Sequence, residues 1–552
     1  MKPIFTFDLT LGTPVTRTKV VTIGGGGHDF GAFGGDEGAA PAGTGAGEVA
    51  GTPGATAGTT PEPTDPSASV GENKFHGTTT REPTVPRSTF HMGPFGRMFR
   101  KLPAWVPPGT TEAEKDTNVR ALAETMFDAP GTGGDPALDN PKIPSGYTYF
   151  GQFVDHDITF DPTSSLTKQN DPNRLHNFRT PRFDLDNLYG EGPDDEPFMY
   201  DQSSPGKFLI GQGKGEGEDD LPRNTQGVAL IGDKRNDENI IVAQLQLAFL
   251  KLHNVVFDRV MSDEGLAGRA AFTRAQEIVR WHYQHVVLFD FLPKLCGENL
   301  VRSMIDFDAP DPADIQLKFY RPKESPFMPV EFSVAAYRLG HSMIRGRYDL
   351  NRIVTARPIF TPDPNAGELD DLRGFRPLPG VWTLDWRLFF SFDGSADGVQ
   401  PSRKIDSKLA SALREIHPGR ASLAALNLLR GFRMGLPSGQ AVARAVRARA
   451  FTNEELGVDP ALVGSETPLW LYILKEAEIG GGEHLGEVGG RIVAEVFLGL
   501  AKSDPNCFLN VDPAWSPATA VAGKPLVDLG GRRLELAHLL RAAGLDKDPF
   551  GV

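Results

Sequence analysis

The chain has 552 residues, a formal net charge of −14 at pH 7 and two cysteines. This length allows a large buried core and would fit roughly two to four domains. Its basic residues are scattered, so nucleic acid and anionic membrane surfaces are not expected as partners, and two cysteines cannot build a disulfide framework or a thiolate metal site of the usual spacing.

The first 88 residues are rich in glycine, alanine, threonine and proline, most clearly between positions 41 and 70. Such a segment has little apolar area to bury, so residues 1–88 are predicted to be a mostly disordered leader, apart from a short strand over 2–11. No second break of this kind follows, and residues 89–552 are predicted to form one domain. The first residues make a poor secretory signal, so the protein is expected to be cytoplasmic or exported by a route other than the Sec pathway.

Beyond the leader, apolar residues recur mainly at helical spacing. Convincing strands with alternating apolar residues are few, so a mainly α domain with long Pro- and Gly-rich loops is expected. Apolar runs such as 491–501 are too short to span a bilayer, and no transmembrane segment is predicted. Helices are predicted over 238–261, 274–295, 330–344, 422–434, 468–479 and 486–501.

Two glycine-rich stretches and one histidine pair are assigned no chemistry. Residues 24–35 and 211–220 neither follow a strand nor open a helix, as a phosphate-binding loop must, and are predicted to be turns. His282 and His285 lack the glutamate and the third ligand of a metalloprotease site, so a structural role is predicted for them.

The stretch GQFVDHDITF, residues 151–160, encloses one histidine between two aspartates within an apolar segment. On a helix, offsets of three and four residues place Gln152, Asp155 and His156 on one face. A single histidine on an apolar helix is more often a satisfied core residue, so this fragment alone does not establish a site.

Four later segments add polar residues in compatible patterns. Arg235 and Glu238 stand three positions apart at the entry of a predicted helix. Oxygen-bearing residues alternate over 180–186, and such alternation along a loop turns side chains and carbonyls toward one point, as hard cations require. The other two segments hold the pairs Arg338 and His341, and Asn427 and Arg430.

In this order and spacing, the motifs resemble those of the animal-type haem peroxidases, the peroxidase and cyclooxygenase superfamily, in a bacterial-type form. The resemblance runs from about Phe95 to Phe508. It implies a mainly helical fold in which haem b is buried between central helices.

On the distal side of the haem, the resemblance implies three catalytic residues. His156 would take a proton from peroxide and return it, Arg235 would stabilise the developing negative charge, and Gln152 would border the peroxide and halide position. Asp155 and Glu238 would form ester bonds to haem methyl groups. The alternative for these two carboxylates is ordinary pairing with arginine or solvent.

On the proximal side, the resemblance implies that His341 ligates the haem iron and that Asn427 accepts its other ring proton. Arg338 and Arg430 would pair with the haem propionates. The alternative for both arginines is a salt bridge on a helix surface.

A calcium site is implied beside the distal histidine. The family often has serine where Asp186 stands, and a carboxylate is a competent ligand there. Binding of Asp157 to the ion would hold the neighbouring imidazole of His156 in place. The implied ligands are Asp157, Thr180, Asp184, Asp186 and the carbonyl of Arg182.

The implied activity is reduction of hydrogen peroxide through an oxoferryl intermediate, followed by oxidation of a small anionic or phenolic donor, by a monomer. Asn239 stands where the chlorinating leukocyte member of the family has a methionine bonded to the haem. The haem is therefore expected to be less oxidising, with bromide, iodide, thiocyanate or phenols as donors and chloride as a poor one.

Two alternatives remain open. The fatty-acid dioxygenases of the superfamily have a radical-forming tyrosine three residues before the proximal histidine, where this chain has Arg338. Tyr337 comes one residue earlier, and on a helix it would be turned about 100° away from the substrate side. The other alternative is a haem-containing adhesion or matrix protein, which the presence of every catalytic position disfavours.

Overall fold

The structure is a computed structural model. It describes residues 93–551, with gaps at 130–134, 162–165, 167, 173–174, 323–325, 362, 364 and 416–421. The leader predicted over 1–88, its strand over 2–11 and the glycine-rich stretch at 24–35 lie outside the described residues. The division into a leader and the domain 89–552 therefore stays a prediction.

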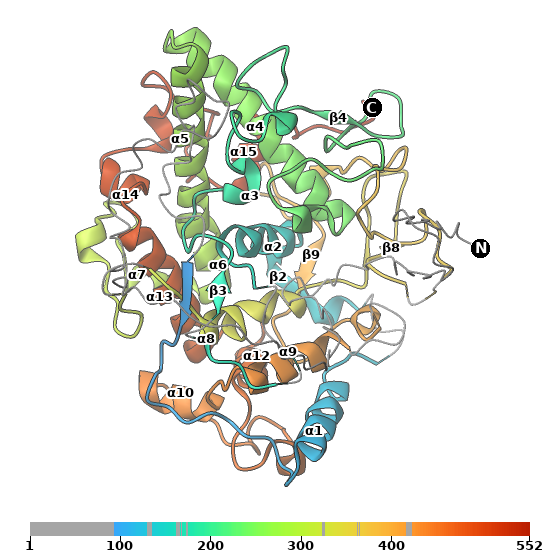
Figure 1. The fold of residues 1–552 in the computed structure, drawn as a ribbon, viewed down its shortest axis with the longest axis vertical. Helices are drawn as coiled ribbons and strands as arrows, with labels where there is room; N and C mark the ends of the chain where they lie inside the picture. Colours follow the sequence, from blue (N-terminus) through green and yellow to red (C-terminus); the bar gives the residue numbers. More distant parts are fainter. Residues whose placement is uncertain are drawn as a thin grey trace, which may run out of the picture.

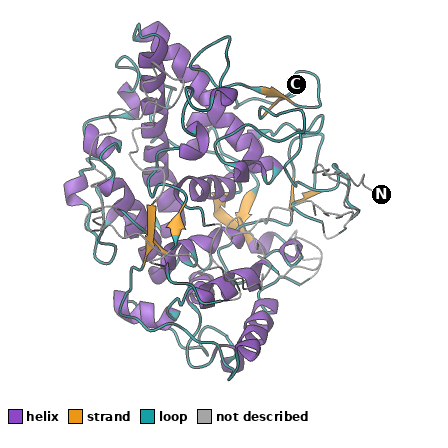
Figure 2. Cartoon of the chain, viewed as in Figure 1, coloured by secondary structure: helices purple, strands orange, loops and turns teal. Residues whose placement is uncertain are grey.

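Helices carry most of the regular structure, which confirms the mainly α class (Figure 2). The α-helices are α1 Glu112–Glu124, α2 Gly146–Ile158, α3 Asp186–Tyr189, α4 Ile240–Asp263, α5 Gly268–Val286, α6 Leu292–Cys296, α7 Glu298–Arg302, α8 Val330–Ser333, α9 Leu423–Arg433, α10 Gly439–Val446, α11 Pro460–Val463, α12 Leu469–Ile479, α13 Glu487–Ser503, α14 Phe508–Val511 and α15 Leu536–Ala542.

The strands of the described residues are short and form small sheets. In the three-stranded sheet, β1 lies between β3, to which it is antiparallel, and β6, to which it is parallel. The pairs β2–β9, β4–β5 and β7–β8 are antiparallel. The strands are β1 Gly93–Gly96, β2 Asp139–Pro144, β3 His176–Asn177, β4 Gly211–Gln212, β5 Asp219–Asp220, β6 Met328–Pro329, β7 Arg347–Tyr348, β8 Arg357–Pro358 and β9 Pro401–Arg403.

Helix α2 lies near the centre of the molecule and contacts α4 as well as the 3-10 helix Ala336–His341, η7 (Figure 1). Every residue of α2 except Gly151 is buried. Its apolar residues pack on neighbouring rings, such as Phe153 on Phe249 of α4 with centroids 4.8 Å apart. Because this helix is enclosed, its polar side chains must find partners inside the protein.

The predicted helices over 238–261, 422–434, 468–479 and 486–501 are confirmed as α4, α9, α12 and α13. The prediction of one helix over 330–344 was wrong: α8 ends at Ser333, and the chain continues as the 3-10 helix η7. The carbonyl of Ser333 accepts a hydrogen bond from Arg338 Nε at 2.7 Å, so a side chain takes the place of the next helical N–H.

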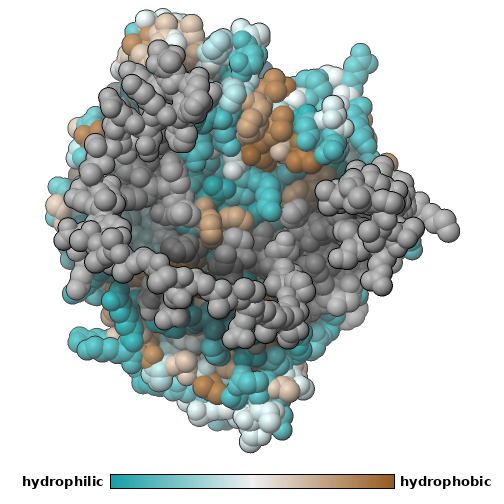
Figure 3. All heavy atoms as spheres, viewed as in Figure 1, coloured by the Kyte–Doolittle hydropathy of each residue, from teal (hydrophilic) through white to brown (hydrophobic). Residues whose placement is uncertain are grey.

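Among the described residues, α4 is long and apolar enough to cross a membrane by length and composition. Sequence inspection did not single it out, because its apolar residues are interrupted by Gln244, Gln246 and Lys251. Of its most apolar window, 83% is buried inside the protein, as in the core helix of a globular domain. On the face shown in Figure 3, the described surface is largely hydrophilic with separate apolar patches.

Candidate active site

A cavity lies between parts of α2 and η7. It is lined by Thr148, Gly151 and Gln152 on the α2 side and by Tyr337 and His341 on the η7 side. The two segments are far apart in sequence, and each brings one of the histidines predicted to be functional. His156 follows Gln152 by one helical turn.

His156 is fully buried and belongs to a chain of three hydrogen-bonded side chains. Its Nδ1 lies 2.7 Å from Oδ1 of Asn236, whose Nδ2 donates to Oε1 of Gln246 at 2.8 Å. Because Oδ1 can only accept, Nδ1 carries the proton and Nε2 is the basic nitrogen. Sequence reasoning missed Asn236 and Gln246; the position of Asn236 directly after Arg235 was the one available signal.

Burial, together with the nearby charge of Arg235, lowers the pKa of His156 to about 3. The imidazole is therefore neutral throughout the physiological range. A general base must be unprotonated before it can accept a proton, so this histidine is ready for that role.

Arg235 is buried beside the backbone of His156. Its Nη2 donates to the carbonyl of His156 at 3.0 Å and to Asp233 at 2.7 Å, and its guanidinium lies 4.4 Å from the ring centre of Phe160. Nη1 has no hydrogen-bond partner among the described residues. Asp233, which sequence reasoning did not identify, thus holds the guanidinium while one N–H group stays available.

Burial raises the pKa of Asp233, but the neighbouring Arg179 and Arg235 outweigh it and hold that pKa well below its usual range. Asp233 is therefore ionised and compensates part of the charge of Arg235.

The side chain of Gln152 is hydrogen-bonded to Glu238 and Asn239, the two residues that precede α4. Its Nε2 donates to Glu238 Oε1 in a short hydrogen bond, and its Oε1 accepts from Asn239 Nδ2 at 3.1 Å. Asn239 also caps α4, because its Oδ1 accepts from the backbone N–H groups of Ile241 and Val242. The structure thus brings Gln152 and Glu238 together, as the predicted site requires.

Asp155 is buried, and neither of its carboxylate oxygens has a hydrogen-bond partner in the part of the chain that the structure describes. Burial raises the pKa of this carboxyl, and the charges of Arg338 and Arg235 oppose the rise. An unsatisfied buried carboxylate is costly, so it indicates a group that binds here.

His341 is buried at the end of η7, and its Nδ1 lies 2.7 Å from the side-chain amide of Asn427 on α9. The predicted pairing of the two residues is present. The amide nitrogen faces the ring, however, so in this arrangement Asn427 donates instead of accepting. A half-turn of the amide would present its oxygen to a proton on Nδ1, as ligation of a metal through Nε2 requires.

Arg338 and Arg430 are both buried, and the charge of Arg338 acts on His341. Burial lowers the pKa of Arg338 to about 9, although the charge of Asp155 opposes this effect. Arg430 Nη1 lies 3.5 Å from Asp161 Oδ2. Neither arginine is on a solvent-exposed helix surface, which rules out the simple surface salt bridge considered for them.

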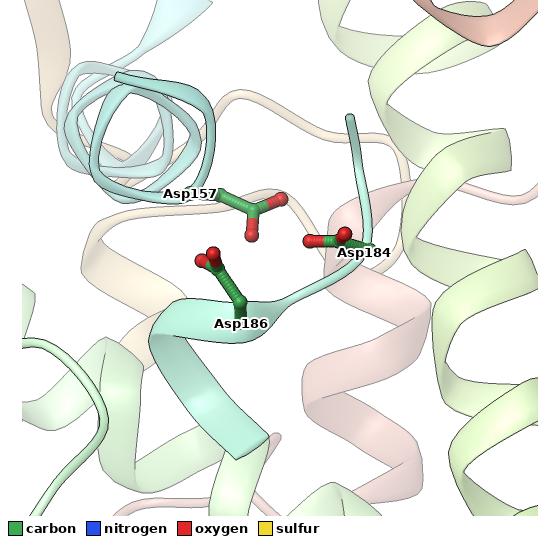
Figure 4. A group of neighbouring side chains, drawn as sticks. All are labelled: Asp157, Asp184 and Asp186. Carbon is green, nitrogen blue, oxygen red and sulfur yellow. The ribbon is translucent and has the colours of Figure 1, made fainter. Parts of the chain in front are cut away.

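Three buried carboxylates meet beside His156 (Figure 4). Asp157 comes from the end of α2, Asp184 from the preceding loop and Asp186 from the first turn of α3, and the oxygens they offer all lie within 4.8 Å of one another. In each residue, Oδ1 has no hydrogen-bond partner among the described residues. Burial and mutual repulsion raise the pKa of Asp157 well above its usual range, and burial raises that of Asp186 to about 8.

This donor set fits a hard divalent cation, which prefers several carboxylate oxygens. Thr180 lies at the edge of the cluster, where its hydroxyl donates to Asp184 Oδ2 at 2.7 Å. The backbone N–H of Arg182 donates to the carbonyl of Thr180 at 2.8 Å, which keeps this loop tightly turned. The roles of Thr180 and of the Arg182 carbonyl as ligands stay predictions.

Tyr337 does not lie where the helical spacing placed it. Its side chain lines the cavity, and its hydroxyl donates to the carbonyl of Gly151 on α2 at 3.2 Å. The expectation that it turns away was therefore wrong. The position of its ring is set by packing on Phe332 and Phe497, with centroids 4.8 and 5.3 Å away. His282 has the predicted structural role, with Nδ1 donating to the Ile278 carbonyl at 2.7 Å.

A family model described as animal haem peroxidase matches residues 164–456, which is more than half of the chain. The chain belongs to the animal haem peroxidase family. Whether it is a bacterial-type member stays a prediction. The match begins after α2, so the roles of the α2 residues rest on the geometry described above.

Among curated relatives, the chain is 24% identical to peroxidasin of Drosophila melanogaster over 231 residues, 39% of this chain and 14% of that protein. It is 25% identical to the chorion peroxidase of Drosophila melanogaster over 329 residues, 56% of this chain and 38% of that protein. The chain thus spans well under half of these relatives.

Two solved structures share the fold. Peroxidase A from Dictyostelium discoideum is 16% identical, with a TM-score of 0.51 over 77% of this chain and 91% of that one. The fatty acid alpha-dioxygenase of Oryza sativa is also 16% identical, with a TM-score of 0.51 over 75% of this chain and 78% of that one. At this identity the likeness concerns the fold alone, and it does not separate the two activities.

Haem, which the family implies, fits the residues around the cavity. His341 lines it as a candidate iron ligand, and the buried cations Arg338 and Arg430 suit carboxylate groups of a cofactor. Asp155 also suits a bound cofactor, because neither of its carboxylate oxygens has a hydrogen-bond partner among the described residues.

Proposed function

We propose that this chain is a haem peroxidase that reduces hydrogen peroxide and oxidises small donors. One observation carries the proposal: His341 lines the cavity, and His156 lies on the helix that forms its opposite wall, one turn beyond Gln152. Both histidines are buried, and an asparagine amide lies 2.7 Å from Nδ1 of each, Asn236 for His156 and Asn427 for His341. His156 therefore has a basic Nε2, and His341 gains one when the Asn427 amide turns its oxygen to the Nδ1 proton.

Bound haem would supply an iron that binds peroxide and accepts oxidising equivalents from it. His156 Nε2 takes the proton from one peroxide oxygen and returns it to the departing oxygen. Arg235 Nη1 donates to the negative charge that develops as the oxygen–oxygen bond breaks. His341 would hold the iron, and Gln152 would border the peroxide, with the orientation of its amide fixed by Glu238 and Asn239.

A donor panel tests the proposed function. The haem-loaded protein is mixed with a fixed concentration of peroxide and with bromide, iodide, thiocyanate, chloride or a phenol in turn. Iodide, thiocyanate and phenols are expected to be oxidised, bromide more slowly and chloride poorly, because Asn239 caps α4 and offers no sulfur to bond the haem. Oxidation of none of these donors would refute the proposal.

We also propose that Asp155 and Glu238 become esterified to haem methyl groups during turnover. The carboxylate of Asp155, which has no hydrogen-bond partner among the described residues, supports the first linkage. The position of Glu238 beside Gln152 supports the second. After several peroxide turnovers, acid extraction should leave haem on the wild type and release it from an Asp155→Asn, Glu238→Gln double variant. Haem fully extractable from the wild type would contradict the linkage.

A second candidate function, fatty-acid dioxygenation, is favoured by one observation, the position of Tyr337 in the cavity. Oxygen uptake with an unsaturated fatty acid tests it. Uptake that disappears in Tyr337→Phe would favour this activity over peroxidation; we expect none, because Arg338 occupies the position of the radical-forming tyrosine.

A further inference from the structure

A second cavity lies beyond the first turn of α2, and we call it the outer cavity. It has a volume of about 220 Å³ and lies between β2, the start of α2, the loop over 390–401 and the start of α15. Among the described residues, Tyr147 alone lines both this cavity and the one between α2 and η7. The two cavities therefore share one aromatic wall.

This wall is fixed by buried contacts. The Tyr147 hydroxyl donates to Asp290 Oδ2 at 2.6 Å, and its ring lies edge-on to Phe390 with centroids 5.2 Å apart. Asp290 belongs to a π-helical turn, Val287–Phe291, between α5 and α6. Such turns are rare and often occur at functional sites. The next residue, Phe291, stacks on Tyr147 and lines the cavity between α2 and η7.

The outer cavity combines flat apolar walls with a positive edge. Ile143, Pro144, Phe390 and Val399 contribute apolar surface. Lys294 also lines the cavity, with its ammonium group 4.9 Å from the Tyr147 ring centre. These surfaces suit a planar ring, because edge-on and stacked aromatic contacts are favourable.

The charges at the outer cavity favour an anion. Lys294 is paired with Asp290, and Glu535 lies 3.4 Å from Arg532, so these acidic groups have cationic partners. Lys142 lines the cavity and is exposed, with no ion-pair partner among the described residues. Ser391 Oγ, also in the wall, has no hydrogen-bond partner in the described part of the chain.

We propose that the outer cavity binds a small aromatic anion, a phenolic carboxylate, as the organic reductant of this enzyme. The proposal rests on the proposed peroxidase function and names one of its substrate classes. Two phenol molecules each lose one electron and one proton, and one hydrogen peroxide takes up both electrons and both protons to give two waters. The carboxylate lies toward Lys142, and the ring lies against Tyr147 and Phe390.

The first test measures binding without peroxide, by calorimetry on the full haem-loaded chain. The probes are 4-hydroxybenzoate, benzoate and the neutral 4-hydroxybenzyl alcohol. Both anions are expected to bind, and Lys142→Gln should weaken them up to about fivefold, the effect of one exposed charge pair. Lys547→Gln, an exposed lysine away from the cavity, should leave their affinity unchanged. Ala396→Trp places a large ring at an exposed position of the cavity edge and should abolish binding of both anions.

The second test compares donors. In Ala396→Trp, the ratio of kcat/KM for 4-hydroxybenzoate to that for iodide should fall at least about fivefold, as binding energy is lost. Anion affinities and a donor ratio that stay the same in Ala396→Trp and Lys142→Gln would overturn the proposed cavity. Iodide oxidation without any benzoate binding would overturn it too, and would leave the peroxidase function standing. Benzoate binding without oxidation of any donor would instead refute the peroxidase function on which the reductant role rests.

Discussion

Replacing His156 by alanine is expected to lower the rate constant for the reaction with hydrogen peroxide by about 10²- to 10⁴-fold, the usual contribution of a general acid–base group. The variant loses the nitrogen that takes the peroxide proton, while Arg235 still offers Nη1. Stopped-flow recording of the haem spectrum after mixing with peroxide measures this rate constant.

Two further variants separate catalysis from structure. Asn236→Leu keeps His156 but removes the acceptor of its Nδ1 proton, so the same rate constant should fall about 10- to 100-fold, as for other groups that orient a catalytic residue. His484→Ala changes an exposed histidine on a loop and should leave it unchanged. An undiminished rate constant in His156→Ala would show that another base acts.

Removing calcium is expected to lower the melting temperature by several degrees. A cation held by Asp157, Asp184 and Asp186 at one hundred times its Kd contributes about 2.7 kcal/mol to the free energy of unfolding. Thermal unfolding with excess calcium and with a chelator measures the difference. Removal should also slow the reaction with peroxide, because Asp157 adjoins His156.

The calcium effect should grow with pH. Without a cation, burial holds the pKa of Asp186 at about 8, above the ordinary value of 3.8, so folding retains a proton and this stabilising contribution is lost as pH rises through 8. Calcium replaces that proton, so the difference in melting temperature should be larger at pH 8.5 than at pH 6. Asp258→Asn, at an exposed carboxylate, should keep this pattern, and Asp184→Asn should reduce it. Equal melting temperatures with calcium and chelator at pH 8.5 would contradict the site.

Local spacing was enough to predict the parts of the site that lie on one regular element. Gln152, Asp155 and His156 share one buried helix, as the offsets of three and four residues indicated. Asp184 and Asp186 also meet, as the alternating loop suggested, and Asp157 joins them as the family resemblance implied. These features depend on short-range geometry, which sequence patterns record.

Contacts between distant segments were not predictable in this way. Apart from the position of Asn236 next to Arg235, the sequence does not indicate that Asn236 and Gln246 are hydrogen-bonded in series to His156 Nδ1. It also does not indicate that Asp233 pairs with Arg235. Tyr337 was misplaced because the direction of its ring depends on packing against Phe332 and Phe497, which helical periodicity does not record. The π-helical turn that positions Asp290 leaves no mark in the pattern either.

The central claim is that haem binds between α2 and η7 with His341 on the iron, and then reacts with peroxide. A spectrophotometric haem titration followed by one addition of hydrogen peroxide tests it most directly. We expect one haem per wild-type chain, a spectrum of histidine-ligated iron and a prompt spectral change with peroxide, and we expect His341→Ala to lose the ligated spectrum. A wild-type chain that binds no haem, or bound haem that peroxide leaves unchanged, would contradict this account.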